Sequence, residues 1–146
     1  MQSLFYILGL GVGIGLVVQV GMNSTLRATL GSALVAALIS FLVGSGALAA
    51  FIAVTRTPLP AREQFAAVPP WAWLGGLLGA FYVASSVIVG PKLGAATLLA
   101  LVVLGQLGTS LLVDHFGWLG FAQHPLTLVR VAGAALLFAG VLLITR

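Results

Sequence analysis

Charged side chains are scarce in this 146-residue chain, and cysteine is missing altogether. Only 5% of the residues are Asp, Glu, Lys or Arg, whereas 61% are hydrophobic. A soluble domain of this size typically carries about 25% charged residues, which keep its surface hydrated. The surface of this chain is therefore expected to face lipid. The lack of cysteine excludes disulfides and thiolate metal sites.

The small number of charged residues also limits the classes of function that the chain can have. The net charge of +4 comes from six basic and two acidic residues, and the basic residues stand singly near the ends of apolar runs. Nucleic-acid-binding surfaces need clusters of Lys and Arg, so no nucleic-acid partner is predicted. The sequence contains no catalytic triad, phosphate-binding loop or metal cluster, so we expect neither an enzyme nor a cofactor or metal. No charged residue lies in the middle of an apolar run, which argues against coupling through a buried acid and favours neutral or anionic solutes.

Five apolar runs are long enough to cross a bilayer, which takes roughly 20 residues, with a range of about 17–25. The predicted helices cover residues 4–22, 33–54, 71–89, 93–113 and 126–144. The first can continue as helix toward Leu30, and it is interpreted as a retained helix because no basic segment or clear cleavage site accompanies it. We therefore predict an all-α integral membrane protein with five transmembrane helices, forming a single membrane domain over residues 1–146.

The predicted connections are short and contain the usual turn residues. Residues 55–70 hold four prolines and several charges, which predicts a polar loop with room for one short helical turn. Gly90-Pro91-Lys92 predicts a tight hairpin at which proline ends the third helix. Residues 114–125 hold both histidines and form the other sizeable loop.

The basic residues do not favour either side of the membrane. With five helices, one side receives Arg56, Arg62 and Arg130, and the other receives Arg27, Lys92 and Arg146. Orientation is set mainly by the Lys and Arg bias of short loops. Here each side of the membrane receives three basic residues, so there is no bias. Either weaker features fix one orientation, or the chain inserts both ways.

Insertion in both orientations would allow two copies to form an antiparallel homodimer. Such a pair has the architecture of an inverted repeat, which many secondary transporters use to form a site near the bilayer midplane. Five helices are few to enclose a solute path, whereas ten suffice. We predict this antiparallel dimer, with a single-orientation chain beside a related five-helix partner as the alternative.

Polar residues at helical spacing mark the first helix. Gln19 and Asn23 follow Gly11 and Gly15 at intervals of four and precede Arg27, so all five share one helical face. Unpaired polar groups facing lipid cost several kcal/mol, about 2–7 for an amide-like group. These side chains either line a polar pathway or form interhelical hydrogen bonds that hold the fold.

Two further helices carry candidate lining residues. Thr97 and Gln106 lie in the fourth helix, and Tyr82 and Ser86 lie in the third. Buried tyrosine usually directs its hydroxyl to a polar partner, although Tyr82 is also an ordinary core residue. The predicted substrate-binding set is Gln19, Asn23, Tyr82, Ser86, Thr97 and Gln106.

A second group lies where the fourth helix ends. Asp114 and His115 are adjacent, and a carboxylate beside an imidazole can relay protons. Alternatively, both are solvated at the interface and fix the loop. With Arg130, we predict that they organise the connection between the fourth and fifth helices, or form a gate.

Four segments resemble a known family, in the same order along the chain. They are Gln19-Val20-Gly21-Met22-Asn23, Pro91-Lys92-Leu93-Gly94-Ala95-Ala96-Thr97, Gly105-Gln106-Leu107 and Asp114-His115-Phe116-Gly117, and the resemblance continues through Pro125, Arg130, Gly133 and Gly140. The chain resembles YdcZ-like proteins, half-size members of the drug/metabolite transporter superfamily. The resemblance implies five helices per chain, a bacterial inner-membrane location, and two halves assembled into a ten-helix transporter. It also implies export, without a defined substrate.

The function predicted from these observations is a small secondary transporter, an exporter of a small organic solute by alternating access at the dimer interface. The sequence specifies neither the solute, the coupling ion nor the direction. A dual-topology ion channel and a non-transporting assembly subunit are the alternatives. Small multidrug exporters, which have four helices, place an essential acid in their first helix. This chain has none there, so their cationic substrates do not carry over.

Overall fold

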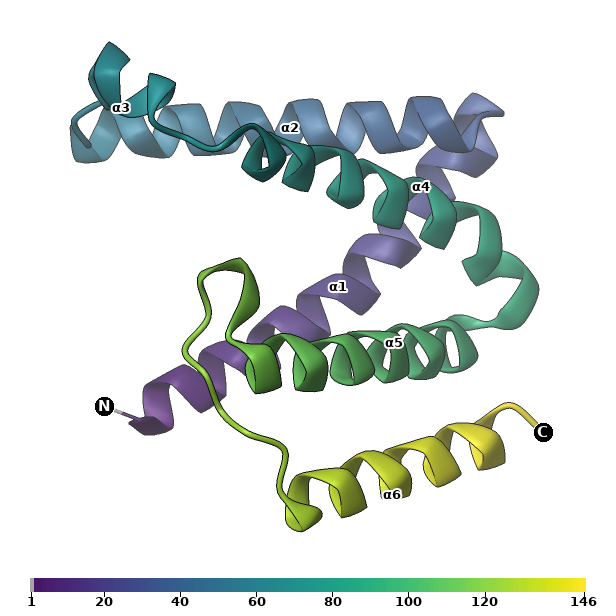
Figure 1. Cartoon of the computed structure of the whole chain (residues 1–146). Coiled ribbons are helices and arrows are strands. Elements are labelled where there is room, and N and C mark those ends of the chain that lie inside the picture. Colours follow the sequence, from purple (N-terminus) through teal and green to yellow (C-terminus); the bar gives the residue numbers. More distant parts are fainter. Residues whose placement is uncertain (1) are drawn as a thin grey trace. The chain divides into compact units, whose positions relative to one another are not determined.

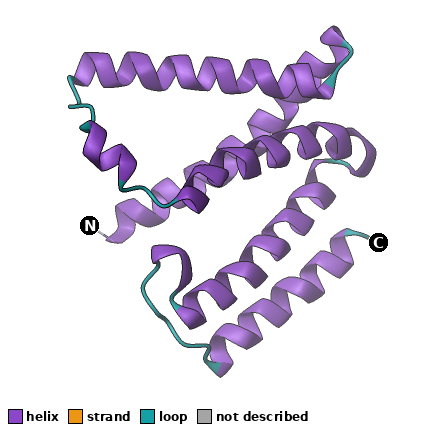
Figure 2. Ribbon diagram, turned by 45° about the horizontal axis from the view of Figure 1, so that its top comes forward, coloured by secondary structure: helices purple, strands orange, loops and turns teal. Residues whose placement is uncertain are grey.

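The computed structural model describes residues 2–146, which form helices joined by short connections (Figure 1). In chain order these are α1 (Gln2–Leu30), α2 (Ala33–Thr55), α3 (Arg62–Ala66), the 3₁₀ helix η1 (Pro70–Leu74), α4 (Gly75–Leu93), α5 (Ala95–Phe116), the 3₁₀ turn η2 (Trp118–Gly120) and α6 (Leu128–Ile144). Residues 2–146 contain no β-strand, as Figure 2 shows. The prediction of an all-α chain is confirmed.

Four of these helical segments are long and apolar enough to span a membrane. They cover residues 2–30, 33–55, 70–93 and 95–116. The fifth predicted helix is present as α6, but its 17 residues make it shorter. At about 1.5 Å per residue it is about 25 Å long, against a hydrocarbon core of about 30 Å. That α6 spans the bilayer stays a prediction.

The junction of α1 and α2 is a two-residue break. Gly31 adopts a left-handed φ of +74°, and its N–H donates to the carbonyl of Arg27 at 2.8 Å. This geometry ends a helix and favours glycine because it has no Cβ. Ser32 then caps α2 by accepting a hydrogen bond from the N–H of Val35 at 3.3 Å. The prediction that α1 continues to Leu30 is confirmed.

The predicted hairpin at Gly90-Pro91-Lys92 is wrong. Helix α4 continues through Pro91 to Leu93, and the break falls at Gly94, which has φ +81°. A proline inside a helix removes the hydrogen bond that its N–H would have made to the carbonyl four residues earlier, and its ring crowds that carbonyl. The helix nevertheless completes its last turn here, and it ends where glycine permits a positive φ.

Other boundaries shift by a few residues. Helix α5 runs over 95–116 rather than 93–113, and α4 is preceded by η1, which starts at Pro70. Helix α6 begins at Leu128 rather than at residue 126, because Thr127 caps it by accepting from the N–H of Arg130 at 3.3 Å. The short helix α3 is the helical turn predicted in the polar loop.

The chain divides into two compact units, Met1–Pro91 and Lys92–Arg146. In the first, α1 packs beside α2, and the first half of α2 meets the second half of α4 around a small core of Ala37, Val83 and Val87. In the second, α5 packs beside α6, with Leu98 and Val113 of α5 and Val141 of α6 buried.

Most large apolar side chains point outward from these units. Leu10 in α1 is 71% exposed and Leu136 in α6 is 74% exposed. Such surfaces are unfavourable in water, whereas a bilayer or a second membrane protein can cover them. The fold therefore fits a chain that is solvated by lipid.

Candidate functional site

A cavity of about 230 Å³ in the first unit contains Gln19. Its wall consists of Gln19 from α1 and a stripe of α2, namely Ser40, Phe41, Gly44, Ser45 and Leu48. The Gln19 side chain is half-buried, and the two serine hydroxyls add donors and acceptors to the same hollow. The cavity thus combines an amide and two hydroxyls with apolar walls, a composition typical of sites for small organic molecules.

The α2 side of this cavity follows from helical spacing. Phe41, Gly44, Ser45 and Leu48 recur at intervals of three and four, so they share one helix face. Gly44 has no side chain and Ser45 a small one, which leaves room opposite Gln19. The sequence interpretation missed both serines, although they are the only hydroxyl residues inside the otherwise apolar run 33–54. That contrast was the signal.

One turn further along α1, Asn23 is 3% exposed, and Ser86 in α4 is 2% exposed. Tyr82 packs against the core cluster of α2 and α4 and is half-buried. The first unit therefore places all four predicted residues of α1 and α4 on its packed faces, with Gln19 lining the cavity.

Helices α2 and α4 approach each other closely where Phe41 meets Gly79. A Cβ built on Gly79 would lie 3.4 Å from the Cζ atom of Phe41, so glycine lets the aromatic ring lie against the α4 backbone. Phe41 also lines the Gln19 cavity. Gly79 therefore lies at a helix-packing contact, whereas Gly75 has no neighbour within 4 Å of such a position.

Arg27 joins α1 to α4 through the main chain. Its Nη1 donates to the carbonyl oxygen of Val87 at 2.9 Å. Val87 lies four residues before Pro91, so its carbonyl is the one whose usual helical donor proline lacks. The guanidinium supplies the missing hydrogen bond. This role of Arg27 was not predicted from the sequence.

The second unit holds Thr97 and Gln106, both in α5. Thr97 is half-buried and Gln106 is exposed. Exposure of an amide on a membrane helix fits a surface that a partner or a polar path covers. Their assignment to the substrate-binding set stays a prediction.

The second unit also assembles the predicted Asp114, His115 and Arg130 group. Arg130 Nη2 donates to Asp114 Oδ2 at 3.0 Å, and its Nη1 donates to the carbonyl of His124 at 3.0 Å. The N–H of His124 donates to the carbonyl of Asp114 at 2.7 Å. Arg130 thus ties the start of α6 to the end of α5 and to the loop between them.

His115 completes this connection. Its Nδ1 accepts a hydrogen bond from the N–H of Leu126 at 3.2 Å, and its carbonyl accepts from Gln123 Nε2 at 2.9 Å. Because Nδ1 acts as an acceptor, the ring proton lies on Nε2 in this arrangement. These contacts fit the predicted organising role, and a gating role stays a prediction. Within residues 2–146 no group of three His, Asp or Glu side chains is arranged to hold a metal ion.

Comparison with known proteins gives a family for the chain. The family described as "Putative inner membrane exporter, YdcZ" matches residues 4–143. A protein of Escherichia coli (strain K12) named "Inner membrane protein YdcZ" is 32% identical over 145 residues, which cover 99% of this chain and 97% of that protein. No solved structure gives a significant match. Because the likeness spans nearly the whole of both chains, this chain belongs to the YdcZ family of membrane proteins.

Proposed function

We propose that the chain is a small secondary transporter of the inner membrane, an exporter that moves a small organic solute by alternating access. The observation that carries this proposal is the cavity between α1 and α2, where Gln19 faces Ser40 and Ser45. The exporter description of the family and the inner-membrane name of the relative support it.

The chemistry of the cavity limits the solute. Its named polar groups are an amide and two hydroxyls, which are neutral and can both donate and accept hydrogen bonds. They suit a solute with hydroxyl, amide or carboxylate groups. A cation would need a buried acid to offset its desolvation, and Asp114 and Glu63, the two acids of the chain, lie at the end of α5 and in α3.

The working unit of this proposal is an antiparallel pair. Balanced basic residues, three on either side, support insertion in both orientations. Helix α1 also has an open small-residue face, because Gly11 and Gly15 have no neighbour within 4 Å of an added Cβ. Small residues allow close helix contact in lipid. In this pair each chain contributes five spans, α6 included, and Thr97 and Gln106 join the solute path.

The function is tested by flux from vesicles. Purified protein is reconstituted into liposomes loaded with a defined mixture of small organic acids, amino acids and sugars, and released solutes are measured by mass spectrometry. We expect saturable release of one solute class, reduced at least about tenfold by Gln19→Ala, which removes hydrogen bonds to the solute. Val18→Ala, a change at a neighbouring apolar position that is 50% exposed and does not line the cavity, serves as the control.

Two outcomes would replace the proposal. Rapid ion currents without solute dependence would identify a channel. Release at the rate of empty liposomes for every solute, with Gln19→Ala changing only the stability of the protein, would identify an assembly subunit.

A further inference from the structure

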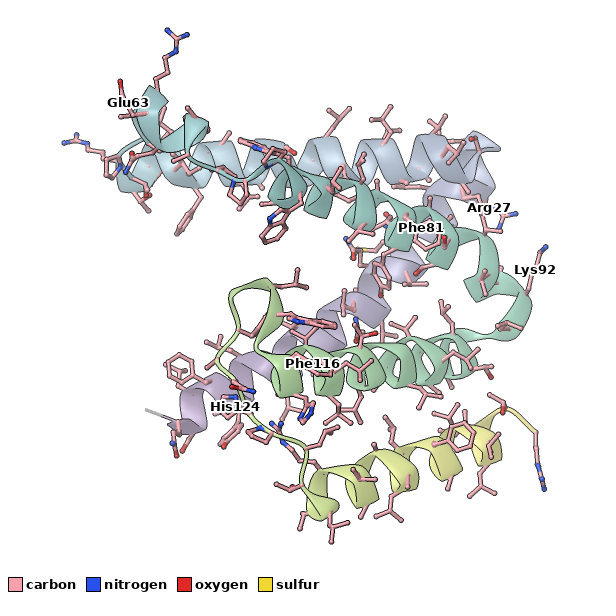
Figure 3. All side chains as sticks on the ribbon, in the orientation of Figure 1. Arg27, Glu63, Phe81, Lys92, Phe116 and His124 are labelled. Carbon is pink, nitrogen blue, oxygen red and sulfur yellow. The ribbon has the colours of Figure 1, made fainter. Side chains whose placement is uncertain are left out.

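A second and larger hollow lies at the end of α1, away from Gln19. It has a volume of about 600 Å³ and is lined by Ser24, Thr25, Arg27, Ala28 and Pro91. Arg27 is half-buried there, and Figure 3 shows it at the junction of α1 with α2. A guanidinium held in a concave, partly desolvated wall is a strong recognition group.

No carboxylate of the first unit can neutralise Arg27. The acid of this unit is Glu63 in α3, beyond the far end of α2 (Figure 3). Helix α2 has 23 residues and is therefore about 35 Å long, whereas charges in solution are screened within about 8 Å. In the described residues the one salt bridge is that of Asp114 with Arg130. The charge of Arg27 is thus left to a ligand or to water.

Arg27 also keeps most of its donors. A guanidinium has five N–H groups, and one of them donates to the Val87 carbonyl. That bond fixes one edge of the planar group and leaves the rest for a bidentate contact. Ser24 adds a half-buried hydroxyl to the same wall, while the Thr25 hydroxyl already donates to the Gly21 carbonyl at 3.1 Å.

The end of a helix normally presents carbonyl groups that repel anions. At the end of α1 the carbonyl of Arg27 has a donor, because it accepts from the Gly31 N–H at 2.8 Å. The guanidinium of the same residue places a full positive charge beside these partial negative charges.

From these contacts we infer that the Arg27 cavity is an oxyanion-binding site for a phosphate-like group. Arg27 binds two oxygens through its free N–H groups, and the Ser24 hydroxyl donates to the same anion. The anion comes either from a soluble phosphate compound or from the headgroup of an anionic phospholipid. The site is separate from the Gln19 cavity and does not depend on transport activity.

Pro91 provides a way to remove Arg27 without losing the fold. Pro91→Ala restores an N–H that can donate to the Val87 carbonyl, so Arg27→Gln combined with Pro91→Ala leaves no orphaned carbonyl. Pro91→Ala alone is the matched reference. Arg62→Gln removes an equal charge at α3, outside the cavity, and is the charge control.

Binding is measured in a maltoside detergent, which contains no phosphate. One arm titrates inorganic phosphate and follows phosphorus NMR line widths. The other arm adds phosphatidylglycerol and counts retained lipid by native mass spectrometry. We expect at least one ligand to bind to the unmodified and Arg62→Gln proteins, and to bind at least about tenfold more weakly to the Arg27→Gln/Pro91→Ala variant than to the Pro91→Ala variant.

The two arms distinguish the sources. An Arg27-dependent phosphate signal indicates a soluble ligand, whereas Arg27-dependent retention of phosphatidylglycerol alone indicates a lipid headgroup. The inference is overturned if neither ligand binds, or if both bind equally to the variant that lacks Arg27.

Discussion

The guanidinium of Arg27 donates a 2.9 Å hydrogen bond to the carbonyl of Val87. This contact joins two helices through residues that are 60 positions apart in sequence, at the carbonyl that Pro91 leaves without a helical donor. A polar side chain on α1 thus completes the backbone of α4. In lipid this matters more than in water, since an unpaired carbonyl has no solvent partner.

The first prediction is a coupling between Arg27 and Pro91. Arg27→Ala should lower the free energy of unfolding in detergent by about 1–3 kcal/mol, because it orphans the Val87 carbonyl. In the Pro91→Ala background the same change should cost less, since the backbone N–H that this substitution restores can donate to that carbonyl. A double-mutant cycle on equilibrium unfolding measures the difference. Equal costs in both backgrounds would show that the hydrogen bond contributes nothing.

The second prediction concerns the contact of Gly79 with Phe41. Gly79→Ala should be tolerated, because its Cβ would lie 3.4 Å from the ring. Gly79→Leu should destabilise the fold by about 1–3 kcal/mol, because overpacking displaces neighbours. Gly75→Leu, one turn away and without neighbours within 4 Å, is the control. The measurement is the free energy of unfolding of the detergent-solubilised monomer. Similar decreases for Gly79→Leu and Gly75→Leu would contradict the packing of Phe41 against Gly79.

The third prediction concerns the connection between α5 and α6. Asp114→Asn should weaken its ion pair with Arg130 and lower the free energy of unfolding by about 1 kcal/mol, a modest value because both side chains are partly exposed. It should also speed proteolytic cleavage between residues 117 and 127. Glu63→Gln removes the other acid and should change neither property. Unaltered cleavage of the Asp114→Asn protein would leave the ion pair without an organising role.

The fourth prediction concerns orientation in the membrane. Leu59 lies in the loop after α2 and is 78% exposed. In a chain without cysteine, Leu59→Cys should react with an impermeant thiol reagent from both sides of a vesicle population. Two lysines added to that loop should shift the reactive fraction toward one side. Labelling from one side alone, unchanged by the lysines, would exclude the antiparallel pair.

Several features were predictable because they depend on local physics. The length and apolarity of the runs predicted the helical architecture, and the four-residue spacing from Gln19 to Asn23 predicted a shared face. The continuation of α4 through Pro91 was not predictable in the same way, because the proline is accommodated by Arg27, a residue far away in sequence. Ser40 and Ser45 can be recognised as lining the Gln19 cavity only when α2 is placed against α1. Contacts between distant segments depend on tertiary packing, and a pattern within one helix does not contain them.

The proposed transport function requires the cavity around Gln19 to be part of an aqueous solute path. Gln19→Cys and Val18→Cys proteins, reconstituted separately in lipid vesicles, report this through their rates of reaction with a charged thiol reagent, which needs water to reach and ionise the thiol. The thiol of the Gln19→Cys protein should react at least about tenfold faster than that of the Val18→Cys protein, because Gln19 lines the cavity, whereas Val18 is outside its lining and is 50% exposed on the apolar surface of α1. Equal rates, or no reaction of the Gln19→Cys protein under conditions that label Leu59→Cys, would contradict the proposed function.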